Sequence, residues 1–224
     1  FMYINLETPE EYVSDMTNLG LVLGNPARAK EIISYYQAKV ERLKKITAGI
    51  EASKKPKVLV VEYFDRGGKA SVEAPPKAWM QTIQAELAGG APVWFDAVGN
   101  SGGWTVVNLE QVAAWDPDQI FLIVWYSLDI DEVVTDLKTD PQWSKLKAIK
   151  NDQLYVVPQD TFGWDTPEPR WILGATWFAT KIHPDLTKDI DMRAEIYEWA
   201  KTLYGMDKAA ADSIIMSRMK VDVK

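Results

Sequence analysis

Aromatic and charged residues stand at or directly after the ends of the four most strand-like runs of this sequence. The segments at these ends are 63–66, 99–104, 125–126 and 158–165. In open parallel sheets, ligands bind beyond the carboxyl ends of the strands. These segments therefore predict a binding surface for a flat or partly apolar ligand, with a few polar atoms to orient it. Each ring also has an alternative role in the core, since Trp and Tyr are intermediate in burial.

Enzyme chemistry has little support among the residues. The chain has one histidine, His183, which stands before Pro184 at the predicted end of a helix, where a capping role is expected. The sequence holds no G-x-S-x-G, no P-loop and no G-x-G-x-x-G. No group of His, Cys and carboxylates has the spacing of a transition-metal site. We therefore expect neither a catalytic residue nor a resident cofactor, and a doubly wound transferase dependent on a nucleotide or cofactor remains the alternative.

The composition excludes several partners. The formal net charge is −7 and no basic run is present, so a nucleic-acid partner is not expected. No apolar stretch approaches the roughly 18 residues of a spanning helix. Cysteine is absent, which excludes disulfides and thiol catalysis. Its absence also argues against a third alternative, a metal-cluster chaperone or nitrogenase-like subunit.

The order of the predicted elements indicates an α/β fold. From residue 58 onward, strand-like and helix-like segments alternate, which predicts a doubly wound, mostly parallel sheet. The predicted strands are 58–63, 93–98, 119–126 and 153–157, and the predicted helices are 8–19, 76–88, 108–115, 129–137, 141–149, 167–181, 190–204 and 208–219.

A long helix over 25–50 precedes this alternation. Asn25 can cap it, and Pro26 occupies the first turn, where a missing N–H costs nothing. Tyr36, Val40 and Leu43 recur at helical spacing, so one face is apolar. Such a helix is roughly 36 Å long, which is typical of a helix that joins two bodies or lies across one.

The sequence of the first residues resembles a strand whose beginning is missing. Segment 1–6 is strand-like, and we expect the chain to be a fragment that lacks its natural N-terminus. If so, the missing leader says nothing about the compartment.

Four segments in order resemble the helical-backbone class of extracytoplasmic solute-binding proteins of ABC importers, the group for iron–siderophores, haem and vitamin B12. Segment 19–29, with LGLVLG before Ala27-Arg28-Ala29, is similar to the start of the backbone helix of that family. Segment 106–120 is similar to its turn into a strand, with Glu110 before Pro117-Asp118. Segment 141–158 is similar to its W-x-x-L-x-A-I-K-N block, and 164–184 to the segment that closes the cleft.

The resemblance implies two lobes joined by the long helix, with ligand held between them. The implied division is a remnant of the N-terminal lobe (1–24), the inter-lobe helix (25–50), the C-terminal α/β lobe (55–189) and closing helices (190–224). Most of the N-terminal lobe, and with it half of any ligand site, is then missing. The resemblance therefore also implies that part of the apolar face of the long helix is exposed or covered by another molecule.

The resemblance also implies a non-enzymatic receptor. It would capture a metal chelate (siderophore, haem or corrinoid) outside the cytoplasmic membrane, in a periplasm or on a lipid anchor, and deliver it to the ABC permease. Glu110 occupies the position of the C-lobe docking carboxylate; otherwise it is an ordinary first-turn Glu. Arg170 has a structural alternative, as partner of Asp165 or Glu168. The predicted cleft residues are Tyr63, Arg66, Trp104, Trp125, Tyr126, Trp164 and Arg170.

Overall fold

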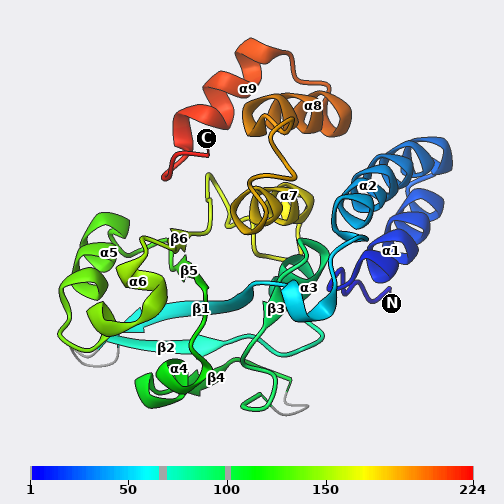
Figure 1. The fold of residues 1–224 in the computed structure, drawn as a ribbon. Helices are drawn as coiled ribbons and strands as arrows, with labels where there is room; N and C mark the ends of the chain where they lie inside the picture. The colour runs from blue at the N-terminus through cyan, green and yellow to red at the C-terminus, as the bar shows by residue number, and fades with distance from the viewer. Residues whose placement is uncertain (1, 66–69, 99–101, 224) are drawn as a thin grey trace.

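The computed structural model describes residues 2–65, 70–98 and 102–223 (Figure 1). Arg66 therefore lies outside the described residues. The helices are α1 (Pro9–Val22), α2 (Pro26–Thr47), α3 (Met80–Leu87), α4 (Leu109–Trp115), α5 (Ile130–Thr139), α6 (Lys147–Lys150), α7 (Trp171–Ile182), α8 (Met192–Tyr204) and α9 (Lys208–Ile214), with 3₁₀ turns at Ala52–Lys54, Trp143–Lys145 and Met216–Arg218. The strands are β1 (Lys57–Asp65), β2 (Ala70–Ala74), β3 (Ala91–Pro92), β4 (Thr105–Val107), β5 (Gln119–Val124) and β6 (Leu154–Val156).

The strands form one sheet in the order β4-β2-β1-β5-β6, with β3 paired to the start of β1. β5 lies parallel to both β1 and β6, while β2 pairs antiparallel with β1 and β4. All six residues of β5 are buried, as expected for a strand covered on both faces. In Figure 1, α7 lies above the sheet and α4 below it. The predicted α/β class with a parallel-rich, doubly wound sheet is confirmed.

Two predicted strands are wrong. In place of a strand over 93–98, only the two residues of β3 pair, and a turn follows. Trp94 is fully buried there and donates its indole N–H to the carbonyl oxygen of Pro75 at 2.8 Å. The apolar pattern thus arose from a buried loop. Residues 2–6 form no strand, because the N–H groups of Asn5 and Leu6 donate to Asp15 on α1 at 2.8 and 3.1 Å.

Helix α2 begins as predicted, with the Asn25 side chain accepting a hydrogen bond from the backbone N–H of Arg28. Its apolar face is not bare. Tyr36 is buried, with its ring 5.6 Å from the ring of Trp171 on α7 and 4.3 Å from that of Tyr12 on α1. Val40 and Leu43 are buried as well. The expectation of an exposed apolar stripe along this helix is therefore wrong, since neighbouring helices of this chain cover it.

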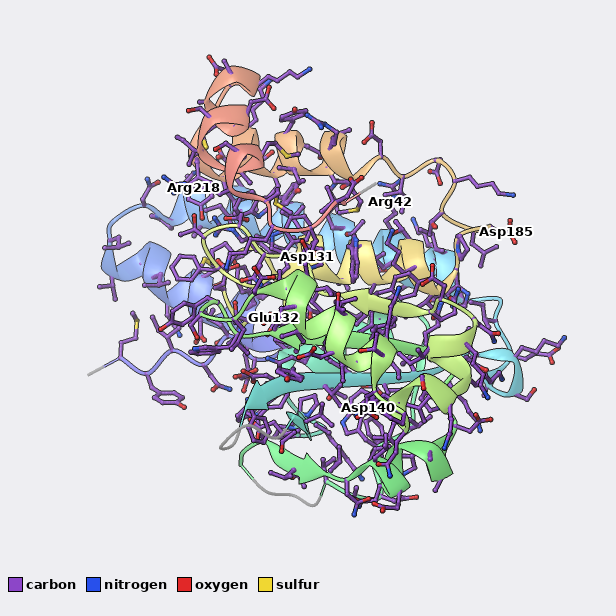
Figure 2. All side chains as sticks on the ribbon, turned by 90° about the vertical axis from the view of Figure 1, so that its left-hand side faces the viewer. Arg42, Asp131, Glu132, Asp140, Asp185 and Arg218 are labelled. Carbon is purple, nitrogen blue, oxygen red and sulfur yellow. The ribbon has the colours of Figure 1, made fainter. Side chains whose placement is uncertain are left out.

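Ion pairs hold α2 against α8. Glu195 on α8 accepts from Lys39 at 2.5 Å and from Arg42 at 2.7 Å. Arg42, labelled in Figure 2, also pairs with Asp189 ahead of α8 at 3.1 Å. The Glu195 side chain is 9% exposed, whereas that of Glu198, a second partner of Lys39, is 54% exposed. Because Glu195 is the more deeply buried carboxylate, its removal should cost more stability than removal of Glu198.

None of the described helices combines the length and hydropathy needed to cross a bilayer.

We expect Glu195→Gln to lower the free energy of unfolding by about 2 kcal/mol, because two cations lose a buried partner. Glu198→Gln is the matched control on the same helix, and its exposed pair contributes less than about 0.5 kcal/mol. Urea unfolding followed by circular dichroism measures both. Equal losses in the two variants would contradict the assignment.

Candidate functional site

A cavity of about 610 Å³ opens at the carboxyl ends of β1, β5 and β6. Its walls come from the strand ends, the segment after β6, α3, the residue before β4 and the C-terminal segment. The lining residues are Glu62, Gln81, Trp104, Ile123, Val124, Trp125, Tyr126, Val157, Gln159, Asp160, Thr161, Phe162, Gly163, Asp165, Thr166 and Lys220. The cavity therefore lies at the edge of the sheet that the sequence predicted.

Exposed aromatic rings surround the mouth of the cavity. Trp125 and Tyr126 are 52% and 69% exposed, and their ring centroids lie 4.8 Å apart. Phe162, across the cavity on the segment after β6, is 59% exposed. Trp104 is half-buried and packs edge-on against Trp79 at 6.0 Å. Large rings left in water beside a cavity provide contact area for a flat or apolar ligand.

Carboxyl and amide groups line the interior of the same cavity. Asp165 is buried and accepts a long hydrogen bond, 3.4 Å, from Nε2 of Gln81 on α3. Burial, then the nearby carboxylates Asp165 and Glu73, raise the pKa of Glu62 to about 7. Burial also raises the pKa of Asp165. Among the described residues, no cation pairs with Glu62 or Asp165. This part of the cavity is thus rich in hydrogen-bond acceptors.

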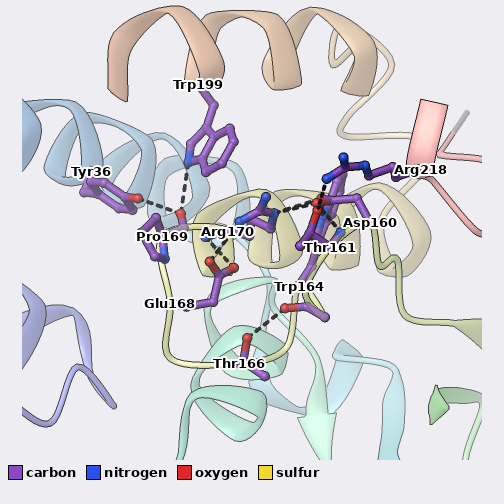
Figure 3. A network of polar contacts seen from close by, with 11 residues as sticks. Tyr36, Asp160, Thr161, Trp164, Thr166, Glu168, Pro169, Arg170, Trp199 and Arg218 are labelled. Atoms are coloured by element: carbon purple, nitrogen blue, oxygen red, sulfur yellow. Dashed lines mark hydrogen bonds and ion pairs between the residues drawn. The ribbon is translucent and has the colours of Figure 1, made fainter. Parts of the chain in front are cut away.

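The wall behind the cavity is built on a buried ion pair (Figure 3). The Asp160 side chain is fully buried, and both its oxygens accept from Nε of Arg170, at 2.8 and 3.0 Å. The indole N–H of Trp164 donates to the same carboxylate at 3.1 Å. Arg170 pairs in addition with Glu168 at 3.1 Å. Burial raises the pKa of Glu168 to about 7, although Arg170 acts in the opposite direction.

The same segment is fastened to the helices. The carbonyl oxygen of Pro169 accepts from the hydroxyl of Tyr36 on α2 at 2.6 Å and from the indole N–H of Trp199 on α8 at 2.9 Å (Figure 3). The guanidinium of Arg170 lies over the ring of Trp199, 5.2 Å from its centroid. The cavity wall therefore connects directly to the long helix and to the closing helices.

Close backbone approach completes the wall. Gln84 on α3 donates through Nε2 to the carbonyl oxygens of Trp164, at 2.6 Å, and Trp171, at 2.8 Å. A Cβ added to Gly174 on α7 would lie 2.3 Å from that Trp164 carbonyl oxygen. Only glycine lets α7 approach the segment this closely.

Comparison with known proteins identifies the family. A family model described as periplasmic binding protein matches residues 2–161. The chain belongs to the periplasmic binding protein family. The helical-backbone class recognised from the sequence is confirmed by solved relatives, one of them a periplasmic solute-binding protein from Veillonella parvula. That structure gives a TM-score of 0.74 at 25% identity, covering 95% of this chain and 62% of that chain.

Two curated relatives of this periplasmic binding protein are similar in sequence. The iron-uptake system-binding protein of Bacillus subtilis is 28% identical over 146 residues, which are 63% of this chain and 43% of that protein. The molybdate-binding protein MolA of Haemophilus influenzae is 26% identical over 103 residues, 46% of this chain and 28% of that protein. The chain thus spans less than half the length of either curated relative.

The structure brings three of the predicted cleft residues of this periplasmic binding protein into the cavity: Trp104, Trp125 and Tyr126. Their contact with ligand stays a prediction. Tyr63 is buried in the core, and Trp164 is fully buried beneath the wall, so neither lines the cavity.

Arg170 is turned to Asp160 and Glu168 instead of lining the cavity. Its alternative role as a partner of Glu168 is therefore confirmed. Asp165, the other partner considered, has no ion pair with Arg170 among the described residues.

The predicted cleft residues did not include Glu62, Gln81 or Phe162, although Phe162 lies in the predicted binding segment 158–165. Glu62 carried a usable signal, because a lone carboxylate inside the apolar run 58–63 has to find a polar environment. Gln81 carried none, since glutamine is ordinary within a helix. Its place in the cavity depends on where α3 lies relative to β1.

We expect Arg170→Met to lower the free energy of unfolding by about 3 kcal/mol, because Asp160 stays buried without its cation. Arg218→Met is the matched control, since Arg218 is exposed and, within the described part of the chain, its side chain donates only to the Thr161 hydroxyl at 3.3 Å. Chemical denaturation measures both. The double variant Asp160→Asn/Arg170→Met should recover part of the loss, and no recovery would contradict the pairing.

We expect wild-type stability to fall as the pH rises from about 5 to about 8. The folded-state pKa values of Glu62 and Glu168 are raised to about 7, so the folded protein binds protons more tightly than the unfolded chain. This contribution is complete below about pH 4.5 and is lost through about pH 7. Glu62→Gln should reduce this pH-dependent loss of stability by about 1 kcal/mol, a figure that already allows for the partial exposure of Glu62.

Urea unfolding at pH 5, 6, 7 and 8 measures this slope. Glu132→Gln is the control, because Glu132 is exposed on α5 (Figure 2) and should leave the slope unchanged. Identical slopes for Glu62→Gln and wild type would contradict the prediction.

Proposed function

We propose that this protein is the substrate-binding component of an ABC importer. It captures an iron-containing or other metal chelate outside the cytoplasmic membrane and delivers it to the permease. One observation carries the proposal: a cavity with exposed rings at the carboxyl edge of a parallel-rich sheet, in a chain of the periplasmic binding protein family. Aromatic rings bind planar or apolar ligand surfaces, and buried polar groups orient them.

The relatives support this class of ligand. Their names give molybdate, iron and, for another Bacillus subtilis protein, Fe(3+)-citrate as the substances bound. A siderophore, haem or a corrinoid each offers a large surface for the rings Trp104, Trp125 and Tyr126. Arg66, which follows β1, is retained as a candidate for the anionic part of such a ligand.

The enzyme alternative has less support. Within the described residues, no group of three or more His, Cys, Asp and Glu side chains could hold a metal ion. His183 lies at the end of α7 with Nε2 3.2 Å from the carbonyl oxygen of Gly89, and it does not line the cavity. It therefore serves as a helix-end contact.

The division of the chain into parts is also a proposal. Residues 1–24 would belong to the N-terminal lobe, 25–50 to the connecting helix, 55–189 to the C-terminal lobe and 190–224 to the closing helices. The contacts of α2 with both α7 and α8 support a strut that limits lobe movement. The receptor would be free in a periplasm or lipid-anchored.

We expect one class of chelate to quench tryptophan fluorescence at low concentration. The titrants are ferric siderophores, ferric citrate, haem and cobalamin, added to the purified protein. Trp125→Phe should remove much of the quenching, because this ring stands at the cavity mouth. Trp115→Phe, at the end of α4, is the control and should retain it. Absence of quenching by every titrant, together with turnover of a nucleotide substrate, would favour the enzyme.

We expect Glu110→Arg to leave chelate affinity unchanged and to impair transport. Glu110 is exposed in the first turn of α4, and no ion pair of its side chain occurs in the described part of the chain. It borders a depression of about 290 Å³ that also includes Lys145 and Lys147. Transport into vesicles that contain the permease measures the effect, with Glu132→Arg as the control. Normal transport by Glu110→Arg would reject its docking role.

A further inference from the structure

Three hydrogen-bond acceptors, on Glu62, Gln81 and Asp165, lie together in the cavity, and no described cation pairs with them. Gln81 is 4% exposed and lines the cavity, and its Nε2 is directed to Asp165. Its Oε1 is buried and accepts no hydrogen bond from any residue that the structure describes. A buried amide oxygen without a donor costs free energy, so its presence in a cavity wall indicates a donor that arrives with the ligand.

The two carboxylates beside Gln81 also lack a described cation to pair with. Glu62 on β1 is half-buried. Burial raises its pKa, and the negative charges of Asp165 and Glu73 repel its ionised carboxylate and so add to this effect. Asp165 is buried, with Gln81 as its only side-chain donor among the described residues. An incoming positive charge would relieve this repulsion and bond to all three groups.

The remaining charged groups of the cavity do not supply that cation. Asp160 is held by Arg170 at the back of the wall. Lys220 is exposed, and its Nζ donates to the carbonyl oxygen of Tyr126 at 3.1 Å. Its hydrogen bond keeps it beside the rings at the mouth. The acceptors are thus available to the ligand.

We propose that Glu62, Gln81 and Asp165 form a subsite for a protonated amine or guanidinium group of the ligand. This inference rests on the proposed function and narrows it to ligands that carry an organic cation. The surrounding rings of Trp104, Trp125 and Tyr126 suit such a group, because aromatic faces attract cations. Two carboxylates and one amide match the several N–H donors of an ammonium or guanidinium.

Ferrioxamine B and its N-acetyl derivative test the proposal. Both are ferric trihydroxamates, and they differ in one terminal amine that acetylation makes neutral. Isothermal titration of the purified protein should show about tenfold tighter binding of the cationic complex, the effect of one charge-assisted hydrogen bond. The preference should disappear in Glu62→Gln and Asp165→Asn and persist in Glu132→Gln. 2-Phenylethylammonium against 2-phenylethanol repeats the comparison without a metal.

Proton release provides a second measurement. Binding of a cation ionises the subsite carboxyls, so at pH 6 the wild type should release protons, seen as a heat that depends on buffer ionisation enthalpy. Glu62→Gln should release fewer. Gln81→Met keeps the approximate shape but removes the amide oxygen and the amide N–H groups, and should weaken binding of the cationic ligands alone.

The outcomes separate the two proposals. Equal binding of cationic and neutral probes, or preference for anionic ferric citrate, overturns the cationic subsite and leaves the chelate receptor standing. Binding of Fe³⁺ or Ni²⁺ alone, lost in Glu62→Gln, overturns the subsite in favour of direct metal ligation. Failure of every chelate and both small probes to bind overturns the receptor and the subsite together.

Discussion

The buried pair of Asp160 and Arg170 is the contact on which the cavity depends. A fully buried carboxylate is tolerated only when a cation and further donors satisfy it, and here Arg170 and the indole of Trp164 do so. The pair fixes the segment after β6 in a single position. In that position the Pro169 carbonyl oxygen accepts hydrogen bonds from the Tyr36 hydroxyl and the Trp199 indole N–H. An irregular segment has thus become a rigid wall.

The cavity combines exposed apolar surface with polar groups that lack a described partner. Its mouth presents rings that are more than half exposed, and its interior presents acceptors without described cations. Both conditions are unfavourable for the protein alone and become favourable when a ligand covers the rings and donates to the acceptors. Folding stability is lower than it would be with a closed, satisfied cavity. This is the usual consequence of keeping a site ready for a partner.

Helix α2 connects this site to the rest of the molecule. Its apolar face packs on α1 and α7, and its basic residues pair with α8. Because Tyr36 also donates to the segment that forms the cavity wall, displacement of α2 would disturb the wall itself. The long helix is therefore coupled mechanically to the cavity wall.

The sequence by itself determined the α/β class, the cap and apolar face of α2, the edge of the sheet where the cavity lies, and the rings Trp125 and Tyr126 at its mouth. These follow from local periodicity, capping and strand ends, which depend on neighbours in the chain. The family, too, could be recognised from four ordered segments.

Only the tertiary structure decided which groups face the cavity. Trp164 and Trp125 are the same residue type, and both stand in segments predicted at strand ends, yet one is fully buried and the other half exposed. Gln81 and Asp165 are 84 residues apart and meet because α3 and the segment after β6 pack together. The loop at 93–98 resembled a strand in sequence because Trp94 and Val98 are buried there, although the segment forms a turn after β3. Burial and partners depend on distant segments, which no local pattern encodes.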